Sequence, residues 1–213
     1  MDAHFWLGRW ERGEIGFHEG RPNALLVKHL LALALAPGAR VFVPLCGKTA
    51  DIPWLLSRGF RIAGAELSQL AVRELFASLG ITPADSAAGP LTHYTWQDID
   101  IFQGDIFELT KAALGPVDAI YDRAALVALP EPTRDRYAAS LVDQTGGAPQ
   151  LVISFEYDQA LVSGPPFSVP ADEIRRLYGA RYEITLLESA PVEGGLRGHP
   201  ASETAWALRK KAR

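Results

Sequence analysis

The feature of this sequence that most constrains its fold is the alternation of short apolar, β-rich runs with segments of helical pattern. Runs that predict strands lie at 40–45, 61–66, 100–103, 117–121 and 150–155. Segments that predict helices lie at 25–35, 50–58, 69–79 and 132–142. Strands that alternate with helices form βαβ units with right-handed crossovers, so they build a mostly parallel sheet. The runs VFVPL and LVISF lack polar alternation, which indicates strands buried on both faces.

The last part of the chain predicts a short helix at 171–178 and two strands at 182–187 and 204–208. Because only a loop joins these two strands, we expect them to pair antiparallel at one edge of the sheet. Segments rich in Pro and Gly predict surface loops at 82–90, 162–170 and 191–200. None of these loops is long enough to separate domains, and a length of 213 residues favours a single domain.

Composition excludes several classes of protein. The chain has 21 Lys and Arg against 25 Asp and Glu, so it lacks the basic excess of a non-specific nucleic-acid binder, and we expect no nucleic-acid partner. The most apolar stretch, 24–36, is shorter than the roughly 20 residues of a membrane-spanning helix, so we expect no membrane partner. A single cysteine excludes an intrachain disulfide, and no paired Cys/His spacing suggests a metal site. Residues 1–12 lack the apolar core of a signal peptide, so a cytoplasmic location is expected.

Ligands of open α/β sheets bind at the carboxyl ends of the strands, so the residues there are the candidate site. The first strand ends at Leu45 and runs into Cys46-Gly47-Lys48, where a glycine lets backbone amides approach a ligand. Glu66 ends the second strand 21 residues after Leu45, where an acidic side chain commonly binds ribose hydroxyls. The turn is neither a G-x-G-x-x-G motif nor a P-loop. On these residues alone, a tight strand-to-helix turn and an exposed terminal carboxylate remain alternatives.

The third and fourth strands end in further polar residues. After the third, Asp105 could read an adenine edge while Ile106 contacts the ring face; alternatively, Asp105 caps the next segment. After the fourth comes Asp122-Arg123, in which the planar guanidinium suits carboxylates. The alternative for this pair is a surface ion pair.

Aromatic residues gather ahead of the first strand: Phe5, Trp6, Trp10, Phe17 and His18. Trp6 and Trp10 are four residues apart, on one face of a helix, and they form either core or a lid over a cleft. His18 is either a base or a structural residue. Cys46 has no histidine near it in sequence, so we interpret it as a small buried residue rather than a nucleophile.

Taken together, these residues resemble the thiopurine S-methyltransferase family. The blocks that carry the resemblance are WxxxWxxGxxGFH (6–18), VFVPLCGKTADIPWL (41–55), GAELS (64–68), YDRAALVAL (121–129) and GPPFSVP (164–170). They occur in the family's order across nearly the whole chain. The PLCGK turn is that family's own variant of the glycine-rich turn of the superfold.

The resemblance implies the class I S-adenosylmethionine-dependent methyltransferase fold. That fold is Rossmann-like α/β, with a seven-stranded, mostly parallel sheet, helices on both faces and one antiparallel strand near the edge. We therefore expect one methyltransferase domain over residues 1–213. Within it, residues 1–36 are expected to form an N-terminal helical lid segment and residues 37–213 the Rossmann-like core. The resemblance also suggests a monomer.

Site residues carry over from the resemblance one by one. The implied contacts with S-adenosylmethionine are Trp10, Leu45, Glu66, Asp105, Ile106 and Arg123. Among them, Trp10 packs over the cofactor, the backbone of Leu45 touches its amino-acid end, and Glu66 binds its ribose. The implied acceptor-side residues are Phe17, Pro165 and Arg197. Arg123 is the expected catalytic residue, because it lies near both cofactor and acceptor in the family.

The implied activity is methyl transfer to the sulfur of aromatic or heterocyclic thiols such as thiopurines. Selenium or tellurium oxyanions, the latter linked to tellurite resistance, are a further acceptor class that uses the same cofactor site. One alternative is a nucleotide-dependent oxidoreductase, against which the missing G-x-G-x-x-G motif counts. Another is a non-catalytic protein that binds small sulfur or metalloid compounds, but one Cys and one Met provide few soft ligands.

Overall fold

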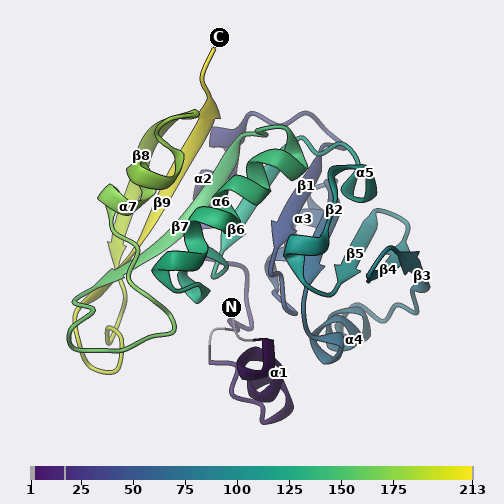
Figure 1. The fold of residues 1–213 in the computed structure, drawn as a ribbon, viewed down its shortest axis with the longest axis horizontal. Helices are drawn as coiled ribbons and strands as arrows, with labels where there is room; N and C mark the ends of the chain where they lie inside the picture. The colour runs from purple at the N-terminus through teal and green to yellow at the C-terminus, as the bar shows by residue number, and fades with distance from the viewer. Residues whose placement is uncertain (1–2, 17, 213) are drawn as a thin grey trace.

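The computed structural model describes residues 3–16 and 18–212, which fold around one nine-stranded sheet (Figure 1). Its strands are β1 (Arg40–Pro44), β2 (Arg61–Glu66), β3 (Ala84–Ala88), β4 (Leu91–Trp96), β5 (Ile99–Gln103), β6 (Ala119–Arg123), β7 (Gln150–Tyr157), β8 (Tyr182–Pro191) and β9 (Ala201–Lys210). They are arranged in the order β3-β4-β5-β2-β1-β6-β7-β9-β8. The strands from β5 to β7 in this order pair in parallel. The order reverses between β1 and β6, which makes the carboxyl ends of these two strands the switch point at which α/β sheets bind ligands.

Helices cover both faces of the sheet. They are α1 (Ala3–Glu11), α2 (Ala24–His29), α3 (Asp51–Ser57), α4 (Gln69–Ser78), α5 (Lys111–Leu114), α6 (Glu131–Thr145) and α7 (Ala171–Tyr178), with 3-10 helices η1 (Leu30–Leu33), η2 (Ile106–Glu108) and η3 (Leu126–Ala128). Figure 1 shows α6 crossing one face and α1 lying beyond the carboxyl end of β1.

Two hydrophobic clusters form the core, one on each face of the sheet. Along β1, Phe42 belongs to the cluster that packs under α6 and α7, whereas Val41 and Val43 belong to the cluster under α2, α3 and α4. Successive residues of a strand point to opposite faces, so an apolar run without alternation is buried on both sides. The interpretation of VFVPL as a doubly buried strand is therefore confirmed.

The α/β architecture is confirmed, with a parallel core from β5 to β7 and antiparallel pairs at both edges of the sheet, and several bounds are confirmed too. The strand predicted at 61–66 is β2 and the helix predicted at 171–178 is α7. The C-terminal strands pair antiparallel, because β9 lies between β7 and β8 and runs against both. The segment 162–170 contains no helix or strand, as expected.

Within the described residues the sheet has nine strands rather than the expected seven, because the predicted loop at 82–90 contains β3 and the residues that follow it form β4, which is not predicted from the sequence either. Strand β3 pairs antiparallel with β4, and β4 pairs antiparallel with β5, so a hairpin extends the sheet at one edge. The sequence ADSAA of β3 is almost wholly exposed and holds no β-branched or aromatic residue. Backbone pairing with β4, rather than burial of side chains, stabilises it, so its composition is that of a loop.

Two other elements are displaced from their predicted positions. The strand predicted at 117–121 is β6, which begins and ends two residues later, so Asp122 and Arg123 lie inside the strand rather than after it. The helix predicted at 25–35 is divided into α2 and η1, and it starts where the side chain of Asn23 accepts hydrogen bonds from the amides of Leu25 and Leu26. Among residues 3–16 and 18–212, no helix has the length and apolar character needed to cross a membrane.

Candidate active site

A small pocket opens at the carboxyl ends of β1, β2 and β5. Its lining residues are Ala3, Leu45, Ala65, Glu66, Leu67, Gly104, Asp105, Ile106 and Phe107. Four of the six predicted cofactor residues, Leu45, Glu66, Asp105 and Ile106, are therefore brought together by the fold. Ala3 belongs to α1, so the N-terminal helix closes one side of the pocket. The predicted residues thus come from three strand ends, and the helix above them comes from the segment expected to form a lid.

Glu66 is held rigidly at the end of β2, with 6% of its surface exposed. Its Oε2 accepts a hydrogen bond from the amide of Gly47 at 2.8 Å, and its Oε1 accepts one from the amide of Ser68 at 2.7 Å. Burial raises the pKa of Glu66, while the amides of Ser68, Gly47 and Leu67 act in the opposite direction. An ionised carboxylate has about four lone-pair sites, so these bonds leave acceptor capacity for ligand hydroxyls.

The turn after β1 has an unusual backbone. Leu45 has a φ of 48°, a left-handed conformation that non-glycine residues seldom adopt. Gly47, with a φ of 53°, lies so close to Trp10 that a Cβ atom there would be 3.1 Å from the indole ring. Trp10 itself is 6% exposed. The indole of α1 therefore packs directly on the turn whose amide holds Glu66, and a side chain at residue 47 would push it away.

At the end of β5 the two predicted adenine contacts have different surroundings. Ile106 is buried, whereas Asp105 is exposed. The Oδ1 atom of Asp105 accepts a hydrogen bond from the amide of Phe107 at 3.0 Å and caps η2. Through this oxygen Asp105 acts as a capping residue, which is the alternative interpretation of its role. Asp105 still lines the pocket beside Ile106.

Arg123 ends β6 on the other side of β1, and its side chain is 11% exposed. It forms an ion pair with Glu19, a residue of the segment between α1 and α2. His18 lies in the same region: burial lowers its pKa, and the charges of Lys48 and Arg123 lower it further. Lys48 in turn forms an ion pair of 2.8 Å with Glu74. The fold thus collects charged groups around Arg123 that the sequence does not place near one another.

Asp51 is the buried centre of a polar network beneath this region. Its carboxylate accepts hydrogen bonds from the amide of Asn23 at 2.7 Å, the hydroxyl of Tyr121 at 2.9 Å and the hydroxyl of Thr49 at 3.0 Å. The side-chain amide of Asn23 donates to Glu203 on β9 at 3.3 Å. The start of α2 is therefore fixed to α3, β6 and β9 together.

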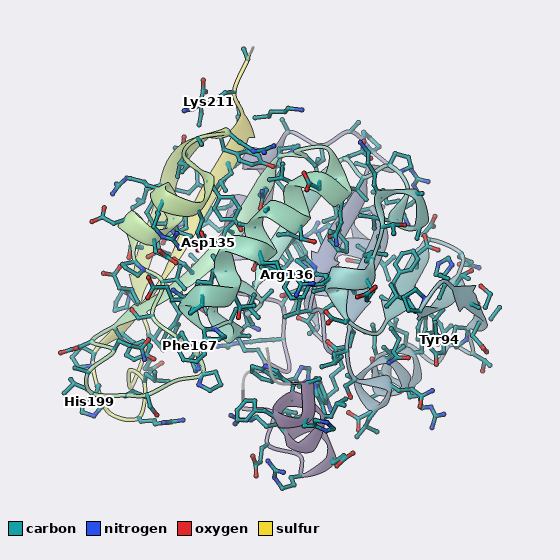
Figure 2. The ribbon with its side chains drawn as sticks, in the orientation of Figure 1. Tyr94, Asp135, Arg136, Phe167, His199 and Lys211 are labelled. Carbon is teal, nitrogen blue, oxygen red and sulfur yellow. The ribbon has the colours of Figure 1, made fainter. Side chains whose placement is uncertain are left out.

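The predicted acceptor-side residues lie on loops or outside the described residues. Phe17 lies outside the described residues. Pro165 is half-buried in the loop after β7, which is tied to η3 by a 2.7 Å hydrogen bond from the amide of Phe167 to the carbonyl of Val127. Arg197 is exposed in the turn between β8 and β9. Figure 2 marks these two loops by Phe167 and His199, at the end of the molecule where α1 lies.

An electrostatic contact relates the two loops. Burial raises the pKa of Tyr157, and Gln159, then Arg197, oppose this effect. The hydroxyl of Tyr157 donates to the carbonyl of Pro166 at 2.6 Å. Arg197 is therefore close to the loop that carries Pro165, and the pocket lined by Glu66 and Ile106 is formed by other residues.

Cys46 is buried, and burial raises the pKa of its thiol well above the ordinary value. The thiol is therefore protonated near neutral pH, which supports its interpretation as a small core residue. Across residues 3–16 and 18–212, no group of three or more His, Cys, Asp or Glu side chains is arranged to hold a metal ion.

Glu19, Asp51 and Glu203 are polar site residues that the strand-end analysis missed. Glu19 directly follows the GFH run, but the sequence separation of 104 residues from Arg123 hides their contact. Asp51 lies one turn after PLCGK and reads as an ordinary first-turn acid. Glu203 lies just before 204–208, the last predicted strand, and it belongs to none of the sequence motifs.

Comparison with known proteins gives a consistent result. The family model of thiopurine S-methyltransferase matches residues 1–208. The thiopurine S-methyltransferase of Xanthobacter autotrophicus is 58% identical over 212 residues, which cover 99% of this chain and 100% of that protein. The thiopurine S-methyltransferase of Gluconobacter oxydans is 52% identical over 206 residues, which cover 96% of this chain and 94% of that protein.

Solved structures show the same fold at low sequence identity. The N-methyltransferase NodS of Bradyrhizobium japonicum, in complex with S-adenosyl-L-homocysteine, has a TM-score of 0.67 at 13% identity and covers 99% of this chain and 100% of its own. Magnesium protoporphyrin IX methyltransferase of Synechocystis, with bound S-adenosylmethionine, has a TM-score of 0.65 at 15% identity. The match covers 99% of this chain and 98% of that protein's chain. The sheet order, the strand-end pocket and the sequence matches therefore agree: the chain has the class I methyltransferase fold and belongs to the thiopurine S-methyltransferase family.

Proposed function

We propose that this protein transfers the methyl group of S-adenosylmethionine to the sulfur atom of aromatic and heterocyclic thiols such as thiopurines. The observation that carries the proposal is the buried carboxylate of Glu66, held by the amide of Gly47 at the switch point of the sheet, in a chain of this family. The relatives from Xanthobacter and Gluconobacter bear the name of this activity, which supports extending it to this chain.

The residues around the pocket suit S-adenosylmethionine chemically. Glu66 is an acceptor-only group that matches vicinal ribose hydroxyls, and Ile106 offers an apolar face to an adenine ring. The backbone of Leu45 reaches the amino-acid end, and Asp105 stands at the edge of the adenine position. When bound, the cofactor supplies an electrophilic methyl group on a sulfonium, which departs as a neutral thioether.

Arg123 provides the charge that the acceptor needs. A thiol on an electron-poor ring ionises without a strong base, and a fixed guanidinium stabilises the resulting thiolate. No acid is required, because the leaving group carries no charge once the methyl has moved. The main remaining contribution of the protein is to position the sulfur atom of the acceptor in line with the methyl group of the cofactor. We assign this to Trp10 and Pro165 as apolar walls, with residues 1–36 acting as a lid and Phe17 and Arg197 on the acceptor side.

Selenium and tellurium oxyanions belong to the same proposal as further acceptors, because a singly charged anion can occupy the place of the thiolate beside Arg123. We also propose a monomer that acts in the cytoplasm. Light scattering on the purified protein tests the first of these, since a dimer would double the mass of the chain.

The test of the function is calorimetric titration with S-adenosylhomocysteine, comparing the wild type with Glu66→Ala. Loss of the ribose acceptor should weaken binding at least tenfold. Glu108→Ala, an exposed acid near the same pocket, is the matched control and should bind as the wild type does. If the folded wild type fails to bind, the methyltransferase proposal is wrong, and titration with a dinucleotide then examines the oxidoreductase alternative. Methyl transfer to aromatic thiols, selenite and tellurite is assayed next.

A further inference from the structure

Arg123 interacts electrostatically with two carboxyl groups that come from distant parts of the chain. Glu19 forms the ion pair with its guanidinium. Glu203, on β9, is close enough for Arg123 to affect its titration: burial raises the pKa of Glu203, Arg123 opposes this, and Glu19 adds to it. The cation that we assign to the acceptor therefore faces one carboxylate in direct contact and a second one nearby.

The two carboxyl groups differ in how firmly they are held. Glu203 is buried to a large extent, accepts a hydrogen bond from Asn23, and lies in a strand that pairs with β7 on one side and β8 on the other. Glu19 belongs to an irregular segment between α1 and α2, and its side chain is 39% exposed. Glu203 is thus held in place within β9, whereas Glu19 can leave Arg123 by rotating its own side chain.

Neighbouring charges are already balanced. Burial and nearby cations lower the pKa of His18, which keeps its imidazole neutral at pH 7. Lys48 is paired with Glu74. Asp51 accepts three hydrogen bonds within its own network. Of the charged groups that the described residues place around Arg123, Glu19 is therefore the one that an incoming anion can replace.

We propose that Glu19 is a specificity-determining residue that favours acceptors whose only negative charge is the one on the reacting atom. This inference rests on the proposed function, and it deepens it by defining the acceptor class. A thiolate displaces Glu19 from Arg123 and takes its place. An acceptor that carries an additional carboxylate brings a second charge, which the displaced Glu19 repels. Without the charge of Glu19, such a carboxylate meets less repulsion beside Arg123.

The test compares two coloured aromatic thiols with the wild type and Glu19→Gln. One is 4-nitrothiophenol, whose thiolate carries one charge; the other is 5-thio-2-nitrobenzoate, whose thiolate and carboxylate carry two. Methylation bleaches both thiolates, so kcat/KM is read from absorbance. We expect the ratio of kcat/KM for the second thiol over the first to rise about tenfold in Glu19→Gln, the effect of removing one partly screened charge a few ångströms away.

Glu14→Gln is the matched control, because Glu14 lies in the same segment and pairs with Arg12 instead of Arg123. Its ratio should equal that of the wild type. A ratio that Glu19→Gln leaves unchanged, or that Glu14→Gln raises equally, overturns the inference. If neither thiol is methylated, the proposed function has failed. The inference is then decided by calorimetric affinities of the two thiols for the protein saturated with S-adenosylhomocysteine, for which the same tenfold change in ratio is required.

Discussion

The buried carboxyl of Asp122 makes the stability of this protein depend on pH in an unusual direction. Asp122 is fully buried on β6, with 0% of its surface exposed. Its Oδ1 accepts a hydrogen bond from the amide of Leu126 at 3.1 Å, and its Oδ2 accepts one from the hydroxyl of Tyr137 at 2.8 Å. Burial raises the pKa of Asp122 from 3.8 to about 6, and these two donors only partly oppose it. The charge of this carboxyl also raises the pKa of Tyr178 on α7, in addition to the larger effect of burial.

The size and sign of the effect follow from linkage. A difference of about 2 in pKa, at 1.36 kcal/mol for each, makes ionisation roughly 3 kcal/mol less favourable in the folded state. Because the folded pKa is the higher one, the folded protein binds more protons than the unfolded chain between about pH 4 and 6. The free energy of unfolding therefore falls through this window as the pH rises, and the whole penalty is present at pH 7.

Asp122→Asn isolates this contribution. The asparagine oxygen can accept from the amide of Leu126 and its NH2 can donate to Tyr137, so the shape and both contacts are kept without a charge. We expect the free energy of unfolding of the variant, relative to the wild type, to increase by about 3 kcal/mol between pH 4 and 7. Urea titrations followed by circular dichroism at four pH values measure it.

Other raised carboxyls do not disturb the comparison. Glu66 and Glu203, whose pKa values burial also raises, are present in both proteins and cancel in the difference. Asp143→Asn, a change of an exposed residue on α6, is the control and should give a difference that is constant with pH. A constant difference for Asp122→Asn as well would refute the reasoning, and a difference that shrinks with rising pH would reverse its sign.

Three further changes have expected outcomes. Arg123→Ala should reduce methyl transfer to an aromatic thiol at least a hundredfold while the melting temperature stays within a few degrees; wild-type turnover with wild-type cofactor affinity would contradict its role. Trp10→Ala should weaken the binding of S-adenosylhomocysteine, measured by calorimetry, about tenfold, because the indole that packs on the turn at Gly47 is lost. An unchanged affinity would show that α1 does not contribute to cofactor binding. Gly64→Ala should lower the free energy of unfolding by about 1–3 kcal/mol, as measured by urea titration. The added Cβ would lie 2.6 Å from Cδ1 of Ile101 and 2.9 Å from Sγ of Cys46. A stability equal to that of the wild type would show that these two side chains shift at little cost.

The central strands could be predicted because burial on both faces leaves a direct mark in the sequence. The apolar runs at 40–45 and 150–155 coincide with β1 and the first part of β7. The edge hairpin could not be predicted from its first strand, because β3 gains its stability from backbone bonds to β4, which composition does not record. Strands buried on both faces can thus be recognised in the sequence, whereas β3, at an exposed edge, depends on its partner β4.

The candidate site divides in the same way. Leu45 and Glu66 could be located because each ends a recognisable strand, and the fold of parallel strands brings such ends together. The contact between Arg123 and Glu19 spans 104 residues and joins a strand end to an irregular segment without periodicity. Charges that meet only in the folded chain leave no characteristic spacing in the sequence, so the sequence alone does not predict this half of the site.

The network around Asp51 has a consequence for how this protein can change over time. Because the amide of Asn23 is bonded to Asp51 and its side chain reaches Glu203, the chain is fixed to the sheet at residue 23. Lengthening or shortening the stretch 12–22 alters how far Trp10 and Glu19 extend over the strand ends and leaves the register of every strand as it was. Small insertions ahead of residue 23 can therefore change the choice of acceptor while Leu45, Glu66 and Ile106 keep their places at the strand ends.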